Sequence, residues 1–230
     1  MSRFPAIGGG GESNPIADKD RAVTFEEADV TVTSPNSDAG INNQGLEQKL
    51  VRFGSHKWYD NGSPASFTVD DPSALSVVLT DQGGYSYTVT DTSINGTTVG
   101  SSLGEFSLDG FSSPYNVEVS FTSDSTTGYN YYCDAKLATG TAYIEWPKPA
   151  GVFRWDAATF NRSQDGGSVD LYIEMSADGG STWEEVTGPI ERGQRIDVPA
   201  DARVRLRVEF SRSDYTTTPR LDSAYRRWVV

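Results

Sequence analysis

The chain has one cysteine and one histidine among its 230 residues. A single cysteine, Cys133, excludes an intrachain disulfide, and a single histidine, His56, excludes a metal site built from several histidines. Long apolar runs are also missing, so the sequence predicts neither a membrane-spanning segment nor the apolar core of a secretory signal. We therefore expect no disulfide framework, no metal or other cofactor, and folding in the cytoplasm.

Positive charge is scarce as well. Lys and Arg number 19 against 32 Asp and Glu, which gives a formal net charge of −13 and a pI of about 4.4. Such a surface repels phosphate backbones and anionic lipid headgroups, so we expect no nucleic-acid partner and no insertion into membranes. The imbalance lies mainly in positions 1–150, which hold 8 basic and 19 acidic residues, against 11 and 13 in the remainder.

Lysine is the rarer of the two cations, with five residues, and Asp supplies most of the acids. Lysine-poor, aspartate-rich surfaces resemble those of proteins from salt-loving archaea, in which high salt screens the self-repulsion of the folded chain. An ordinary acidic bacterial or phage protein can have the same composition. Both origins stay open, and we favour the halophile.

The residues that are abundant indicate an all-β fold. Ser, Thr, Gly, Asp, Val and Tyr dominate, while the long windows of Ala, Leu, Glu and Lys that helices favour are missing. Apolar residues alternate with polar ones in many short segments, which is the pattern of strands with one buried face. The clearest of these segments lie at 67–69, 75–79, 117–121, 129–133, 142–146, 169–175 and 204–210.

We predict two β-sandwich-like domains preceded by an extended arm. Residues 1–22 contain a run of four glycines and no apolar periodicity, which indicates the arm. The prolines of the 147–151 segment cannot lie in a central strand, so we place a boundary there, between a β-rich domain at 23–148 and a C-terminal β-sandwich domain at 149–230. The best helical candidate is the segment 43–53, where Leu46, Leu50 and Val51 are spaced for one helix face.

The most specific local motif is Ser176-Ala-Asp178-Gly-Gly180-Ser-Thr182-Trp183. Asp178 can accept hydrogen bonds from backbone N–H groups of its own turn, glycine permits a positive φ, and Trp183 can pack beneath the hairpin. The motif resembles the Asp box of sialidases, where it is a structural element. A sialidase propeller would require several boxes and a longer chain, so we interpret Ser176, Asp178, Gly180 and Trp183 as a structural hairpin.

Three arginines, Arg203, Arg205 and Arg207, alternate with apolar residues and should share one strand face. They are our candidate interaction stripe, because planar guanidinium groups bind carboxylates of a neighbouring subunit or an acidic glycan through two hydrogen bonds. The alternative, which we favour, is an outer face whose arginines pair with cross-strand acids such as Glu174 and Asp170.

Exposed aromatic rings could bind sugars by stacking, and Trp58 and Tyr59 are the candidates because a loop sequence follows them. Most other tyrosines are better explained as core or cross-strand packing residues. The sequence places no partner near His56 or Cys133, and it singles out no pair of carboxylates for hydrolysis. We therefore name no catalytic residue and expect a protein that is not an enzyme.

The C-terminal domain resembles a β-sandwich module of tail, baseplate and fibre proteins of tailed viruses. The resemblance rests on Phe153-Arg-Trp155, on the hairpin at 169–183, and on the strand at 203–208 together with residues 218–223. It implies a non-enzymatic virion protein, assembled in the host cytoplasm as a symmetric oligomer with other virion proteins. It further implies a place at the tail tip, baseplate or fibre, and contact with a host glycan or S-layer.

Two other functions share these sequence features. A capsid decoration or turret protein differs from a tail protein only in its position on the particle. A carbohydrate-binding cell-surface module would differ by exposed coplanar rings that bind a glycan.

Overall fold

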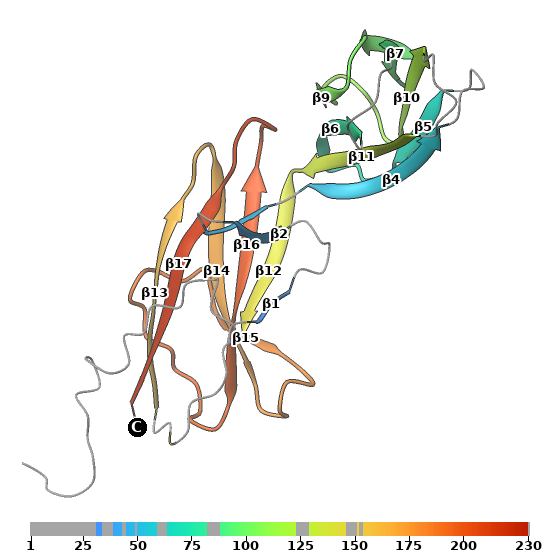
Figure 1. The fold of residues 1–230 in the computed structure, drawn as a ribbon. Coiled ribbons are helices and arrows are strands. Elements are labelled where there is room, and N and C mark those ends of the chain that lie inside the picture. Colours follow the sequence, from blue (N-terminus) through green and yellow to red (C-terminus); the bar gives the residue numbers. More distant parts are fainter. Residues whose placement is uncertain are drawn as a thin grey trace, which may run out of the picture.

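A computed structural model describes residues 31–33, 39–42, 45–48, 50–58, 64–81, 88–122, 129–145, 151 and 154–229. Within these residues the predicted all-β fold is confirmed: the described elements are all strands, arranged in four antiparallel sheets. The four sheets form two face-to-face pairs, each with its own apolar core. The two pairs lie end to end (Figure 1).

The larger pair, here called the base sandwich, contains the C-terminal part of the chain. One sheet has the order β1 (Thr31–Thr33), β12 (Thr139–Glu145), β16 (Arg203–Arg212), β14 (Gly167–Ser176) and β15 (Glu184–Thr187). The other has the order β13 (Arg154–Ser163), β17 (Arg220–Val229), β3 (Gly45–Gln48) and β2 (Ala39–Asn42). Inward-facing residues of both sheets, among them Trp155, Leu206 and Phe210, form one buried cluster.

The smaller pair, here called the inserted sandwich, is built from the segment 51–137. One of its sheets has the order β5 (Ala65–Val69), β10 (Tyr115–Thr122), β7 (Thr88–Ile94) and β8 (Thr97–Gly100). The other has the order β4 (Val51–Trp58), β11 (Tyr129–Leu137), β6 (Ala74–Asp81) and β9 (Gly104–Ser107). The alternating burial of β5 and β10 puts Phe67, Val117 and Val119 into its core. Phe121 and Tyr131 join the two sheets by stacking, with ring centroids 4.2 Å apart.

The two cores do not divide the chain at the predicted boundary near residue 148. Strand β12 lies before that boundary but pairs with β16 along its whole length, and Ala142 and Ile144 belong to the base core. Leu46, on β3, belongs to the same core. Alternation marks β12 as a strand, but it cannot identify the sheet that the strand joins. The predicted arm at 1–22 lies outside the described residues.

The helical interpretation of 43–53 was wrong. Strands β3 and β4 occupy this segment, and its apolar residues serve different cores. Leu46 is buried in the base core, whereas Val51 packs against the inserted core. Leu50 is 38% exposed. The helical spacing was therefore accidental, because a chain passing from one sandwich to the next presents its apolar residues to successive cores.

Among the described strands, the chain passes between the sandwiches from β3 to β4 and returns from β11 to β12. One residue, Ala138, separates β11 from β12, and the chain bends there as it passes from one sandwich to the other (Figure 1). The Ala138 amide donates to Ser73 O at 2.7 Å, and the Arg212 amide donates to Ala138 O at 2.8 Å. The residue at this bend is thus bonded to both sandwiches, which limits their movement relative to each other.

Arg212 also fixes the junction through its side chain. The residue is 5% exposed, and its guanidinium donates to Leu137 O at 3.0 Å and to Thr217 O at 3.1 Å. Lys136 on β11 reaches the base sandwich from the opposite direction, donating to Tyr215 O at 2.9 Å. Charged side chains bonded to main-chain carbonyl groups therefore connect the two sandwiches.

We expect Arg212→Met to lower the free energy of unfolding by about 2–4 kcal/mol, because two carbonyl acceptors at the junction lose a charged donor. Chemical denaturation measures the change, and limited proteolysis should show faster cleavage between the sandwiches. Arg192→Met, on an exposed turn, is the control and should change stability by no more than about 0.5 kcal/mol. Equal effects of the two substitutions would contradict the role assigned to Arg212.

Candidate functional site

The outer face of the five-stranded sheet carries a dense set of charged and aromatic side chains. Along β16 every second residue from Val204 to Phe210 points into the base core, so Arg203, Arg205, Arg207 and Glu209 point outward. Strands β12 and β14 flank β16 on either side. The stripe predicted from the sequence therefore lies on a central strand of its sheet.

Carboxylates of neighbouring strands pair with all three arginines. Glu174, directly opposite Arg205 on β14, accepts bonds from Arg205 at 2.7 Å and from Arg207 at 2.9 Å. Arg203 pairs with Glu145, and Arg207 also pairs with Glu185 and Glu209. Glu174 is 8% exposed although it lies on the outer face, because the two guanidinium groups cover it.

Aromatic rings extend this ion-pair network. The Arg205 guanidinium lies 4.0 Å from the ring centroid of Tyr143 and 4.2 Å from that of Trp183. Arg207 lies 4.1 Å from the centroid of Tyr172. Cation–π contacts of this kind add to the ion pairs and hold the side chains in fixed positions. We call this set the outer-face network: Tyr143, Glu145, Tyr172, Glu174, Trp183, Glu185, Arg203, Arg205, Arg207 and Glu209.

The sequence suggested Glu174 and Asp170 as cross-strand partners of the three arginines. Glu174 pairs with two of them, but Asp170 pairs with none of the three. Asp170 pairs with Arg162, at 3.4 Å. Asp170 faces Glu209 across the ladder, so an arginine from β13 offsets a carboxylate that would otherwise repel its neighbour.

The Asp178 hairpin borders this network at the end of β14. Asp178 Oδ1 accepts bonds from the amides of Ser181 and Thr182, both at 2.9 Å, and from the Ser176 hydroxyl at 2.7 Å. Asp178 Oδ2 accepts from the Thr182 hydroxyl at 2.7 Å. These bonds stabilise the charged form, with the Thr182 amide contributing most, and they hold the pKa of Asp178 well below its usual range.

Glycine and tryptophan complete the hairpin. Gly180 has φ +102° and donates its amide to the Ser176 hydroxyl at 2.7 Å. The positive φ favours glycine here, and a Cβ atom at this position would also lie 2.5 Å from Arg203 Nη1 and displace the end of that side chain. Trp183 contacts Arg205, which connects the hairpin to the outer-face network.

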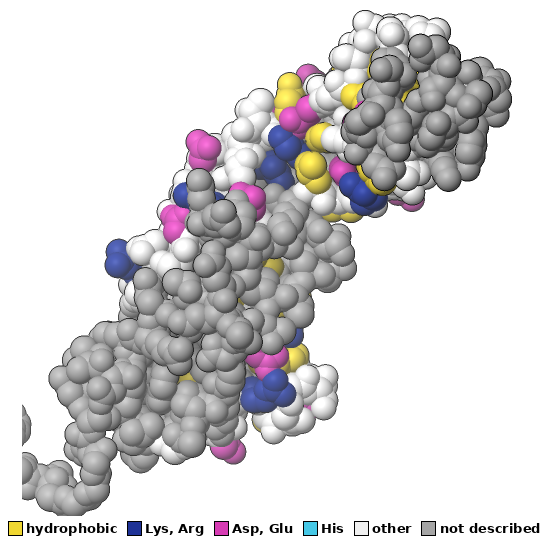
Figure 2. All heavy atoms as spheres, in the orientation of Figure 1, with side chains coloured by type: hydrophobic (Ala, Val, Ile, Leu, Met, Phe, Trp, Pro, Cys, Tyr) yellow, Lys and Arg dark blue, Asp and Glu magenta, His cyan; other side chains and the backbone are white. Residues whose placement is uncertain are grey.

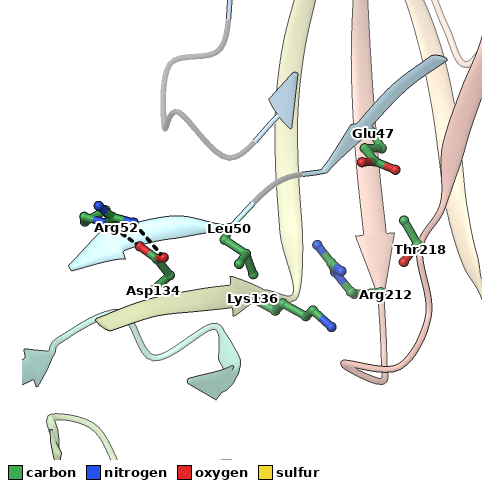
Figure 3. A pocket seen from close by; sticks show the side chains of 7 residues that line it. All are labelled: Glu47, Leu50, Arg52, Asp134, Lys136, Arg212 and Thr218. Atoms are coloured by element: carbon green, nitrogen blue, oxygen red, sulfur yellow. Dashed lines mark hydrogen bonds and ion pairs between the residues drawn. The ribbon is translucent and has the colours of Figure 1, made fainter. Parts of the chain in front are cut away.

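A second candidate site is a hollow of about 710 Å³ at the junction, and Figure 3 shows side chains of both sandwiches around it. Arg52 and Asp134 form a two-bond ion pair on its wall, at 2.6 and 3.0 Å, and Arg52 stacks on Tyr132 at 4.2 Å. The hydrogen bond to Asp134 is the main cause that raises the pKa of Arg52. The remaining lining residues are Glu47, Leu50, Lys136, Arg212 and Thr218.

Sequence reasoning missed this hollow. Arg52 and Asp134 are 82 residues apart and belong to no motif. Lys136 joins Glu105 of β9 to the base sandwich, which again connects distant segments. Figure 2 shows basic and acidic side chains lying together in the region where the sandwiches meet. Only the fold brings these charges together.

The other side chains considered from the sequence contribute little to either site. Tyr59 and the side chains of Trp58 and His56 lie outside the described residues. Cys133 is buried in the inserted core, and burial raises the pKa of its thiol to about 12. In the described part of the chain, no three metal-binding side chains are grouped together, and no helix has the length and apolarity to cross a membrane.

Comparison with protein-family models, curated proteins and solved structures finds no match. The proposals below therefore rest on the resemblance seen in the sequence and on the geometry just described.

Glu174→Gln should lower the free energy of unfolding by about 1–2 kcal/mol, because Arg205 and Arg207 lose the carboxylate that they share. The guanidinium groups keep some contact with water, which limits the effect. Glu184→Gln makes the same chemical change at an exposed position of β15 and should be nearly neutral in denaturant titrations. A neutral Glu174→Gln would show that the network contributes nothing to stability.

Asp178→Asn should destabilise the protein at neutral pH, and the difference from wild type should shrink in acid. A lowered carboxyl pKa stabilises the fold above the unfolded value of about 4, and this contribution is lost as the pH falls toward the folded value. Unfolding temperatures of both proteins, measured from neutral pH downward, test this expectation. Asp165→Asn, in another exposed turn, is the control, and a difference independent of pH would contradict the prediction.

Proposed function

We propose that this chain is a non-enzymatic structural protein of a virion, at the tail tip, baseplate or fibre of a tailed virus that infects a salt-loving archaeon. The observation that carries the proposal is the braced junction, where the bonds of Ala138, Arg212 and Lys136 hold two sandwiches end to end. In this role one sandwich anchors the protein to the particle and the other is presented outward, toward the host surface.

A double connection suits such a role. A domain attached by one linker can rotate, whereas an inserted domain with two connections has fewer free dihedral angles. Here β4 and β11 pair directly beside the junction, at Val51 and Ala135. A force on one sandwich, or a displacement of it, is therefore transmitted to the other, as a virion appendage requires.

Charge supports the same proposal. High salt screens the self-repulsion that a net charge of −13 would otherwise cause within the folded chain. The arginines of the outer-face network are held by acids of the same chain. Their contribution is to order the sheet surface, which is a structural task.

The carbohydrate-binding alternative gains less support from the described residues. Guanidinium groups lie about 4 Å from the ring centroids of Tyr143, Tyr172 and Trp183. A sugar would have to compete with these contacts in order to stack on the same ring faces. The aromatic pair first considered, Trp58 and Tyr59, stays a prediction.

Gold-labelled antibodies against the purified chain, applied to virus particles from an infected culture that makes it, test the proposal. Label at the tail end is the expected result. Label on the capsid would instead favour a decoration or turret protein, and label confined to cell surfaces would overturn the virion assignment. Antibody absorbed with the purified chain must lose its label, which controls for unspecific binding.

A further inference from the structure

A chemically labile dipeptide forms the turn between β7 and β8. Ile94 and Thr97 face each other across Asn95 and Gly96, whose φ angles are +48° and +78°. Positive φ at both central residues is characteristic of a type I′ turn, for which Asn-Gly is a favoured sequence. The turn geometry thus accounts for both residues, but it leaves the chain with a dipeptide that can rearrange.

Asparagine followed by glycine is prone to deamidation, because glycine carries no side chain that hinders its own amide nitrogen. The Gly96 nitrogen loses its proton and attacks Cγ of Asn95. The bond from Cγ to Nδ2 breaks, and ammonia leaves with a proton. Water then opens the resulting succinimide at one of its two carbonyl groups, which gives either aspartate or an isoaspartate whose main chain runs through Cγ.

Three hydrogen bonds hold Asn95 against the segment that leads into β10. The side-chain Nδ2 donates to Ser112 O at 2.9 Å, and Oδ1 accepts from the Asn116 amide at 2.7 Å. The Asn95 amide donates to Asn116 O at 2.8 Å. Asn95 is exposed, so burial does not shield its Cγ from water. Ring closure turns Cγ toward the Gly96 nitrogen and expels Nδ2, so it requires that the two side-chain bonds break first.

We infer that Asn95 is a deamidation site that the native fold suppresses through this clamp, the bonds from Asn95 to Ser112 and Asn116. In the native protein the reaction proceeds only through local opening of the clamp, whereas in an unfolded chain it proceeds freely. The residues that form the hairpin turn are therefore also a chemical weak point, and their reactivity depends on the folding of the inserted sandwich.

Deamidation damages the hairpin that the clamp holds. Aspartate has no amide donor for Ser112 O and instead places a carboxylate beside that carbonyl oxygen. Isoaspartate adds an atom to the main chain within a two-residue turn, which disturbs the pairing of Ile94 with Thr97. Among the described strands β8 pairs only with β7, and its Val99 packs against the inserted core. Loss of the turn therefore exposes apolar surface of that core.

This inference goes beyond the proposed function, because the reaction depends on the fold and not on where the protein resides. A chain that is absent from virus particles would overturn the virion assignment alone. Deamidation of the native and the unfolded chain at equal rates would overturn the clamp alone.

The first test incubates the full chain at neutral pH in guanidinium chloride, and in sodium chloride of the same ionic strength. Mass spectrometry of the peptide that contains Asn95 follows the exchange of its amide for a carboxyl group. We expect deamidation in the native chain to be at least about tenfold slower than in the denatured chain. Reaction at Asn61, which also precedes a glycine, confirms that the denaturing conditions permit deamidation.

Ser113→Ala separates the clamp from folding in general. The Ser113 hydroxyl donates to Asp70 O at 3.1 Å and ties the clamping segment to the end of β5. Its loss should raise the native rate of deamidation at Asn95 at least about threefold, because the clamp opens more often. Ser66→Ala removes an exposed hydroxyl from β5 and should leave the rate unchanged. Circular dichroism checks that both variants are folded, and equal rates in the two would overturn the inference.

Asn95→Asp, which is one of the two products, measures the damage. We expect its equilibrium constant of unfolding to rise about tenfold, because Ser112 O loses its donor. Asn116→Asp is the matched control on β10, since Asn116 Oδ1 accepts from the Thr68 hydroxyl at 3.3 Å and a carboxylate can do the same. This control should be nearly neutral. Equal effects of the two substitutions would show that the side chain of Asn95 holds nothing in place.

Discussion

The arrangement of this protein depends on the junction at which a single residue connects a strand of one sandwich to a strand of the other. β11 and β12 are separated by Ala138, whose amide and carbonyl bond to opposite sides of the junction. Because Ala138 is bonded to Ser73 on one side and to Arg212 on the other, neither sandwich can turn without breaking one of these hydrogen bonds. The buried guanidinium of Arg212 adds bonds that a flexible linker could not hold.

The same arrangement of charged and aromatic side chains occurs in the outer-face network and beside the hollow at the junction. A carboxylate on one strand meets a guanidinium on its neighbour, and an aromatic ring lies against that guanidinium: Asp134 with Arg52 and Tyr132, and Glu174 with Arg205 and Tyr143. A single exposed ion pair stabilises a protein little, but a shared carboxylate between stacked arginines forms a network. Although the chain has few basic residues, several of its arginines lie at such contacts between neighbouring strands.

Local patterns in the sequence predicted what depends on neighbours in the chain. Alternation identified β10, β14 and β16, because each strand has one buried face. The hairpin motif indicated the bonds of Asp178, since both partners lie within four residues. Sheet membership could not be read in this way: β12 joined the base sandwich, and the segment 43–53 formed two strands for two cores. The hollow beside Arg52 required contacts between residues far apart in sequence.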